Sequence, residues 1–276
     1  MPEGDTVYLS ATRLRAALRD EQLTKSDFRV PALATIDLSG RAVEDVVPRG
    51  KHLLFRIQGG LTLHTHYKMD GSWHLYRHGE RWRGPQFEVR AVLKNRSRVA
   101  VGFRLAIVQL IETKHEVQVV GHLGPDPLGE DWDAARVVAS LRAHPDEEIG
   151  ALLLDQRIVA GPGNVYKSEV CFLAGVDPQT PAGKVADLDR LVDLLARLML
   201  ANRTTGTQIT TGDLRPGRQR WVYGRAEQPC FRCGTRIRRR EQDGFGGDRV
   251  TFWCPTCQPV APASIARTTS TAMREG

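Results

Sequence analysis

Long hydrophobic runs are absent from this sequence of 276 residues. No stretch of 18 apolar side chains occurs, so we expect no transmembrane helix. The segment from Met1 to Asp5 has neither a basic nor an apolar stretch, so we expect no secretory signal and a cytoplasmic protein. The 41% hydrophobic and 26% charged fractions are ordinary for a folded protein, and the length predicts about two domains.

Lysine is scarce, although the chain is basic. Of 39 basic residues only 7 are lysine and 32 are arginine, and the formal net charge is +7. Arginine binds phosphate oxygens in a bidentate way that lysine cannot match. A basic chain favours a polyanionic partner, so we expect nucleic acid first and an acidic membrane surface second. Genomic composition bias alone also produces a high arginine content.

Cysteine is almost confined to one module. Four of the five cysteines form two Cys-x2-Cys pairs that are separated by 20 residues: Cys230, Cys233, Cys254 and Cys257. This spacing predicts a tetrahedral Zn²⁺ site at the turns of a hairpin. Two disulfides are the alternative, which a cytosolic setting disfavours. Because four thiolates leave no open position, we expect the zinc to be structural. The fifth, Cys171, is expected to be a small buried residue.

The first half of the chain predicts an antiparallel β-sandwich preceded by a helix. Residues 6–19 have helical spacing, with Val7, Ala11, Leu14 and Leu18 on one face and Asp5 or Thr6 as the cap. Strands are expected at 52–57, 61–65, 87–93 and 98–103. Since strands dominate without intervening helices, a sandwich or barrel ending near residue 120 is favoured.

Beyond a Gly/Pro-rich connector at 121–127 the pattern becomes helical. Helices are expected at 133–143, 147–158, 164–174 and 185–200, followed by a loop over 203–229. The sequence therefore predicts an α+β protein with four parts: a β-sandwich domain at 1–122, a helical domain at 130–225, a zinc hairpin at 226–258 and a disordered tail at 259–276.

The amino terminus offers a candidate nucleophile. If Met1 is removed, Pro2 carries a free secondary amine, part of which is unprotonated near neutral pH. Such an amine forms an iminium with an aldehyde-like carbon, and Glu3 beside it could act as acid or base. Taken alone, Met-Pro-Glu starts many proteins without chemical significance. Lys51, in a turn that enters a strand, is by itself an ordinary solvated lysine.

Two further positions suit anion binding. Asn164 follows Gly161-Pro162-Gly163 at the start of a predicted helix, where glycines and free amide groups can accept an anion. An ordinary helix–turn–helix connector is the simpler interpretation of this segment alone. Arg249 precedes the second strand of the zinc hairpin, at its tip, where positive charge suits a phosphate contact.

Together, in this order, the motifs resemble the formamidopyrimidine-DNA glycosylase/endonuclease VIII family, closest to bacterial endonuclease VIII-type enzymes. The resemblance covers about residues 2–258. It is carried by Pro2-Glu3-Gly4, GKHLL at 50–54, HYKMDG at 66–71, HLGPDPL at 122–128, GPGNVY at 161–166, VYGR at 222–225 and RVTFWC at 249–254. It implies a β-sandwich joined to a helix–two-turn–helix domain with a zinc hairpin, DNA between them, and a damaged nucleotide flipped out of the stack.

The resemblance also implies residue roles. Pro2 would be the nucleophile, Glu3 the acid for base departure, and Lys51 a ligand of phosphate and a participant in β-elimination. Asn164 and Arg249 would bind phosphates, and Arg249 would assist δ-elimination. With them the family implies a possible further active-site carboxylate at Glu169, an apolar wedge for the vacated stack at Met69, and the four cysteines as zinc ligands.

The chain also departs from the family pattern. Asp5-Thr6 replaces the usual Pro-Glu, and Lys68-Met69-Asp70 replaces the Gln-Leu-Tyr wedge of typical endonuclease VIII. The Arg-x-Phe pair of the purine-specific branch has no match at 106–120, and the loop at 204–220 is short. We therefore expect a DNA glycosylase and AP lyase that acts on oxidised pyrimidines, a monomer associated with the nucleoid. A zinc protein that binds damaged DNA without chemistry is the alternative, and an RNA-processing zinc-ribbon enzyme is a third.

Overall fold

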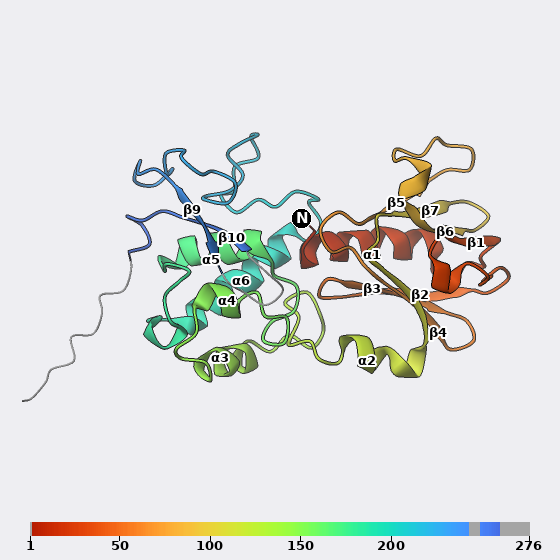
Figure 1. Ribbon diagram of the computed structural model, residues 1–276, viewed down its shortest axis with the longest axis horizontal. Coiled ribbons are helices and arrows are strands. Elements are labelled where there is room, and N and C mark those ends of the chain that lie inside the picture. Colours follow the sequence, from red (N-terminus) through yellow and green to blue (C-terminus); the bar gives the residue numbers. More distant parts are fainter. Residues whose placement is uncertain (1, 243–248, 260–276) are drawn as a thin grey trace, which may run out of the picture.

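The protein consists of two lobes with the amino terminus between them, as seen in a computed structural model that describes residues 2–242 and 249–259 (Figure 1). One lobe holds the β-sheets, and the other holds helices and the cysteine hairpin. A disordered tail is predicted for residues 259–276, and all of these except residue 259 lie outside the described part of the chain.

The first lobe is a sandwich of two antiparallel four-stranded sheets. One sheet has the strand order β1 (Lys25–Phe28), β6 (Val89–Lys94), β7 (Val99–Phe103), β5 (Ser72–Tyr76). The other has the order β2 (Val43–Arg49), β3 (His52–Ile57), β4 (Leu61–His66), β8 (Ile107–Glu112). Helix α1 (Gly4–Leu18) packs against β2 and β3 and contributes Val7, Ala11, Leu14 and Leu18 to the shared core, as its spacing predicts.

Four of these strands are confirmed predictions, and four were not predicted. The segments that form β1, β2, β5 and β8 show no clear alternation of apolar and polar residues. For example, β2 contains Pro48 and two acidic residues, Glu44 and Asp45. The expected strand at 87–93 begins later, because Gln86–Glu88 form a 3-10 turn. Short 3-10 turns also occur at Pro31–Leu33 and Thr113–His115, and the last leads into α2 (Glu116–Val120).

The second lobe packs short helices around α6. These are α3 (Ala134–Arg142), α4 (Ile149–Leu152), α5 (Asn164–Ala174), a 3-10 turn (Ala182–Lys184) and α6 (Leu188–Asn202). The predicted helix over 147–158 is wrong beyond Leu152. There the Asp155 carboxylate accepts a hydrogen bond from the Arg157 amide at 2.9 Å and forms a turn. Strands β9 (Arg238–Gln242) and β10 (Arg249–Trp253) form the hairpin, and β10 packs on α5.

Candidate active site and zinc module

The Glu3 side chain binds the first turn of a helix from the other lobe. Its Oε2 accepts hydrogen bonds from the amides of Gly163, at 2.7 Å, and Tyr166, at 3.4 Å. Its Oε1 accepts from the Val165 amide at 2.8 Å. These are the otherwise unpaired amides at the start of α5. Glu3 is itself the cap residue of α1 but makes no side-chain cap bond, so the expected cap at Asp5 or Thr6 is wrong.

Burial controls the charge of Glu3. The side chain is fully buried, which raises its pKa above the ordinary value, against the Lys51 ammonium and the amides of Val165 and Gly163, which lower it. The carboxyl of Asp5 raises the pKa of Glu3 further. A buried carboxyl group of this kind holds a proton at higher pH than a free one and can therefore deliver it.

The turn at 160–163 gathers the predicted catalytic residues. The Gly4 amide donates to the Gly161 carbonyl at 2.9 Å, which docks the amino-terminal segment on this turn. The Lys51 ammonium donates to the Pro162 carbonyl at 2.5 Å. Pro2 is half-buried at the start of the same segment, and Met1 lies outside the described residues. Pro2, Glu3 and Lys51 therefore come together, although Lys51 is 48 residues from Glu3 in the sequence.

A second set of bonds fixes the turn that carries Lys51. Gly50 has φ +55°, and its amide donates to Oδ2 of the buried Asp126 at 2.6 Å. Gln156 supports the opposite turn: its Oε1 accepts from the Gly161 amide at 2.9 Å, and its Nε2 donates to Pro162 at 3.1 Å. No sequence pattern predicts these roles of Asp126 and Gln156, because each side chain binds main-chain groups of a turn, and the partner of Asp126 is 76 residues away.

Asn164 is the first residue of α5, and the cap residue is Gly163. The Asn164 side chain is almost fully buried, yet its Oδ1 has no hydrogen-bond partner among the residues that the structure describes. Arg249 is the first residue of β10 and pairs with Gln242 of β9, which places it at the tip of the hairpin. The Arg249 side chain is not described.

Glu169 holds a loop rather than facing open space. Its Oε2 accepts from the Trp221 amide at 2.8 Å and from the Thr210 hydroxyl, and its Oε1 accepts from the amides of Val222 and Tyr223 at 2.9 and 2.8 Å. The side chain is fully buried. Glu169 lies on α5, the helix whose first turn binds Glu3. These hydrogen bonds therefore attach the segment 221–223 to the helix that begins with Asn164.

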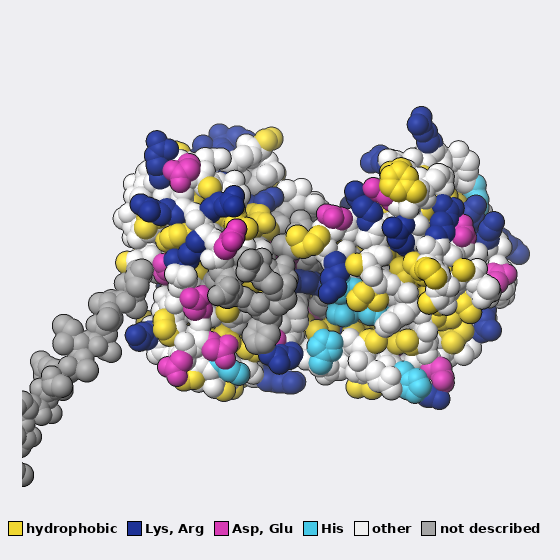
Figure 2. All heavy atoms as spheres, viewed as in Figure 1, with side chains coloured by type: hydrophobic (Ala, Val, Ile, Leu, Met, Phe, Trp, Pro, Cys, Tyr) yellow, Lys and Arg dark blue, Asp and Glu magenta, His cyan; other side chains and the backbone are white. Residues whose placement is uncertain are grey.

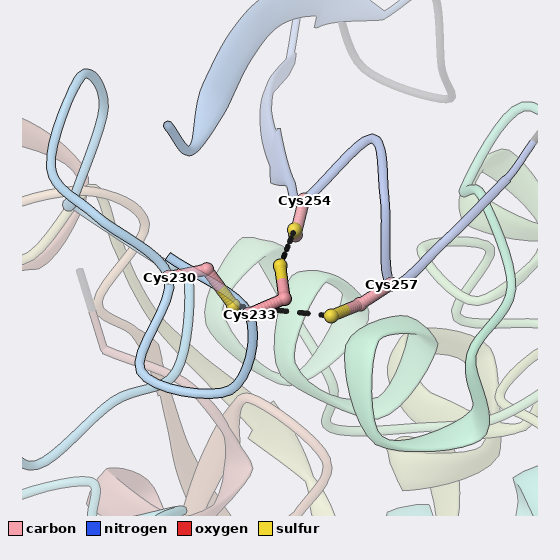
Figure 3. A group of neighbouring side chains, drawn as sticks. All are labelled: Cys230, Cys233, Cys254 and Cys257. Atoms are coloured by element: carbon pink, nitrogen blue, oxygen red, sulfur yellow. Dashed lines mark hydrogen bonds between the residues drawn. The ribbon is translucent and has the colours of Figure 1, made fainter. Parts of the chain in front are cut away.

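The four predicted cysteines converge (Figure 3). Their sulfur atoms all lie within 4.8 Å of one another, with Cys230 and Cys257 at 3.9 Å and Cys233 and Cys254 at 3.4 Å. A tetrahedral zinc site with bonds of about 2.3 Å needs sulfurs about 3.8 Å apart, so the set fits a structural Zn²⁺. Such an ion would hold the hairpin together and supply no catalytic position.

The cysteine module is attached to the loop that Glu169 binds. The Arg225 guanidinium lies 3.3 Å from the centre of the ring of Phe231, a residue that follows Cys230 in the sequence. It also donates to the carbonyls of Trp221, at 2.5 Å, and Pro229, at 2.7 Å. Phe172 of α5, Val222, Ile237 and Phe252 share one apolar cluster with Cys230 and Cys254. Folding of the module therefore supports the loop and the helix beside the candidate active site.

Comparison with known proteins agrees with this arrangement. Residues 1–106 match the formamidopyrimidine-DNA glycosylase N-terminal domain, residues 123–211 its H2TH domain, and residues 227–260 the zinc finger found in FPG and IleRS. The chain is 53% identical over 272 residues to "Probable endonuclease 8 2" of Streptomyces coelicolor, covering 97% of this chain and 98% of that protein.

This chain belongs to the formamidopyrimidine-DNA glycosylase family. It is also 45% identical to "DNA-(apurinic or apyrimidinic site) lyase Nei2" of Mycolicibacterium smegmatis, covering 95% of this chain and 100% of that one. A crystal structure of wild-type Lactococcus lactis Fpg with DNA that contains N7-benzyl-Fapy-dG has the same fold, with a TM-score of 0.79 at 24% identity, and covers 94% and 100% of the two chains. The predicted fold class, structural zinc and enzyme class are thereby confirmed.

The turn that follows β4 presents the predicted wedge to solvent. Met69 is 55% exposed, whereas Tyr67, two residues earlier, is buried. The Gly71 amide donates to the Tyr67 carbonyl at 2.9 Å, and a β-carbon on Gly71 would lie 2.6 Å from that oxygen. This tight turn therefore holds the Met69 side chain in an exposed position.

Proposed function

We propose that this protein is a bifunctional DNA glycosylase and AP lyase of base-excision repair that removes oxidised bases, pyrimidines in preference, and cuts the strand by β,δ-elimination. The enzyme class follows from the family. The residue roles rest on one observation: the Pro2-Glu3-Gly4 segment and Lys51 both bind the turn at 160–163. This turn leads directly into the helix that begins with Asn164.

The proposed chemistry begins once Met1 is removed. The Pro2 nitrogen forms a bond to C1′ of the damaged nucleotide, and the glycosidic bond breaks, so the base leaves with its electron pair. The proton that the Pro2 nitrogen loses goes to the departing base, Glu3 assists this departure by donating its proton to the ring oxygen as the sugar ring opens, and an iminium remains. Loss of a C2′ proton then expels the 3′ phosphate, and a second elimination expels the 5′ phosphate. Lys51 and Arg249 assist these two steps.

DNA recognition in this proposal uses both lobes. Asn164 and Arg249 bind phosphates next to the lesion: Asn164 begins α5 directly after the turn that binds Glu3 and Lys51, and Arg249 lies at the tip of the hairpin. Met69 fills the space that the extruded base leaves. Glu169, whose oxygens bind four donors, acts by positioning the 221–223 segment and does not contact the reacting sugar.

The preference for pyrimidines rests on the short segment after α6. The Thr210 amide donates to the Gln219 carbonyl at 2.8 Å, and the Thr211 hydroxyl donates to the Arg218 carbonyl at 2.6 Å. These bonds close the segment into a compact turn, which leaves little chain to cover a large purine lesion. No described helix is long and apolar enough to cross a membrane. We expect a monomer that acts on chromosomal DNA in the cytoplasm, at the nucleoid.

Borohydride trapping tests the proposal. The protein, with its mature terminus checked by mass spectrometry, is incubated with duplexes that contain an abasic site or an oxidised pyrimidine. A covalent adduct that maps to Pro2 is expected. Pro2→Gly, which keeps a primary amine, should still form some adduct, and acetylation of the terminus should abolish it. A protein that has lost Met1 and holds zinc but gives no adduct would favour the non-catalytic DNA-binding alternative.

A further inference from the structure

Four histidines lie together where the two lobes meet, and the proposed chemistry uses none of them. This histidine cluster consists of His52, His64, His66 and His122. His52 and His66 face each other across β3 and β4, with ring centres 4.6 Å apart, and His122 comes from the connector between the lobes. Figure 2 shows histidine side chains gathered at this junction, beside basic ones.

A chain of hydrogen bonds fixes which nitrogen of His52 carries the proton. The Gln109 amide on β8 donates to Nδ1 of His64 at 2.8 Å, so the proton of a neutral His64 is on Nε2. His64 Nε2 lies 2.8 Å from His52 Nδ1 and donates to it. A neutral His52 therefore carries its proton on Nε2. No acceptor for that N–H exists among residues 2–242 and 249–259, and His52 is only partly buried.

The environment keeps these rings uncharged. Burial, with further contributions from the neighbouring histidines and Lys68, lowers the pKa of His52 to about 2. Burial, with Lys68 and Lys51, lowers the pKa of His66 to about 4, and burial lowers the pKa of His64 to about 4. A group with such a low pKa cannot serve as an acid or base near neutral pH. It can still donate a hydrogen bond from its N–H.

The position of His52 indicates an acceptor on DNA. His52 follows Lys51 in the chain and pairs with His66, which begins the turn that carries Lys68 and Met69. The charge of Lys68 acts on His52, and the charges of both Lys51 and Lys68 act on His66. We infer that a DNA strand bound at both the Pro2 turn and the Met69 turn lies close to His52. A metal is disfavoured because the lone pair of His52 Nδ1 is already taken by His64, and the four cysteines are the one metal-ligand group in the described chain.

We propose that His52 donates its Nε2–H to a phosphodiester oxygen of the bound strand, and that His64 and Gln109 are positioning residues which present that proton. This inference rests on the proposed function only in assuming that DNA occupies the junction of the lobes. A neutral donor adds affinity without displacing a counterion, so its contribution persists at high salt. Lys51 nearby supplies the salt-dependent part.

The test measures binding to a duplex with a non-cleavable abasic analogue over a range of salt. His52→Phe should weaken binding by about two- to tenfold, as loss of one neutral hydrogen bond does. The slope of log affinity against log salt should stay unchanged in this variant, whereas Lys51→Met should reduce it by about 0.9. His144→Phe, an exposed histidine after α3, is the matched control and should bind as the wild type does. Unchanged affinity of His52→Phe, or a slope reduced by about one, overturns the proposal.

Two further measurements identify the contact. In the first, single phosphates of the DNA strand are replaced one by one with neutral methylphosphonates. At one position the replacement should weaken DNA binding by the wild type but not by His52→Phe. Nitrogen-15 spectra of wild-type histidines should show Nε2–H forms for His52 and His64, and Gln109→Leu should give a mixture at both. An Nδ1–H form of His52 in the wild type would contradict the proposed sequence of hydrogen bonds from Gln109 through His64 to His52. Borohydride trapping of the same variants separates this outcome from failure of the Pro2 chemistry.

Discussion

Gly163 and Glu3 are packed so closely that no side chain fits at position 163. A β-carbon there would lie 2.6 Å from Cδ of Glu3 and 2.7 Å from its Oε1. The φ of Gly163 is −134°, in the extended region that any residue adopts. Contact with the carboxyl group, and not backbone conformation, therefore requires glycine here. The same residue donates its amide to Glu3, so the glycine both admits the carboxyl group and binds it.

Replacing Gly163 with alanine should displace the Glu3 carboxyl group. We expect a loss of stability of about 1–3 kcal/mol, typical of overpacking, and a larger loss of base excision than of cleavage at a pre-formed abasic site. Thermal unfolding and single-turnover rates on the two substrates measure these effects. Gly60→Ala, where φ is +71° and nothing lies within 4 Å, provides the control for backbone strain. Equal loss of excision in both variants would show that the contact is unimportant.

The amide version of Glu3 should separate two roles of this side chain. Both carboxyl oxygens accept from main-chain amides, so Glu3→Gln turns an NH2 group toward an N–H donor. We expect a stability loss of about 1–3 kcal/mol from the unsatisfied donors. Base excision should fall more than cleavage at an abasic site, because the latter requires no base departure. Equal reduction of both rates would argue against Glu3 as the acid for base departure.

The raised pKa of Glu3 predicts the direction of a pH effect. A carboxyl group whose pKa is raised by burial is protonated at higher pH than usual, so its acid function is lost as pH rises through that raised pKa. The contribution of Glu3 to the free energy of unfolding is also lost as pH rises through the raised pKa, because the buried carboxyl group must then carry a charge. The rate of base excision should fall on this limb, while cleavage of an abasic substrate should not follow the same limb. Single-turnover rates over a pH series on both substrates check this.

The sequence predicted the elements with strong local patterns but not the contacts between them. The helix with Val7, Ala11, Leu14 and Leu18 and the cysteine pairs were predicted because their signals lie within short segments. The role of the Glu3 carboxyl group at the start of α5 could not be predicted, since 160 residues separate Glu3 from Gly163. The same holds for Asp126 and for the hydrogen bonds that join Gln109, His64 and His52, because tertiary packing brings these partners together.

Met69 should matter for duplex DNA and not for folding. Because the side chain is 55% exposed, Met69→Ala should change stability by less than about 0.5 kcal/mol. Excision from a duplex should fall, since the vacated stack is no longer filled, whereas excision from single-stranded DNA should be unaffected. Val117→Ala, which removes a 68% exposed apolar side chain from α2, is the control. A parallel loss on both substrates would indicate that Met69 does not act as a wedge.

Loss of zinc should weaken DNA binding through the structure of the hairpin. Removing one ligand with Cys233→Ser should release the metal, because a tetrahedral site needs all four thiolates. The Arg225–Phe231 contact and the apolar cluster around Cys230 would then loosen, and Arg249 would no longer be held at the hairpin tip. Metal content by mass spectrometry and affinity for abasic-analogue DNA measure the two effects. Cys171→Ala, a buried cysteine that is not a ligand, should keep one zinc per chain and normal affinity. If the metal-free Cys233→Ser protein bound DNA as tightly as the wild type, the hairpin would not be a phosphate clamp.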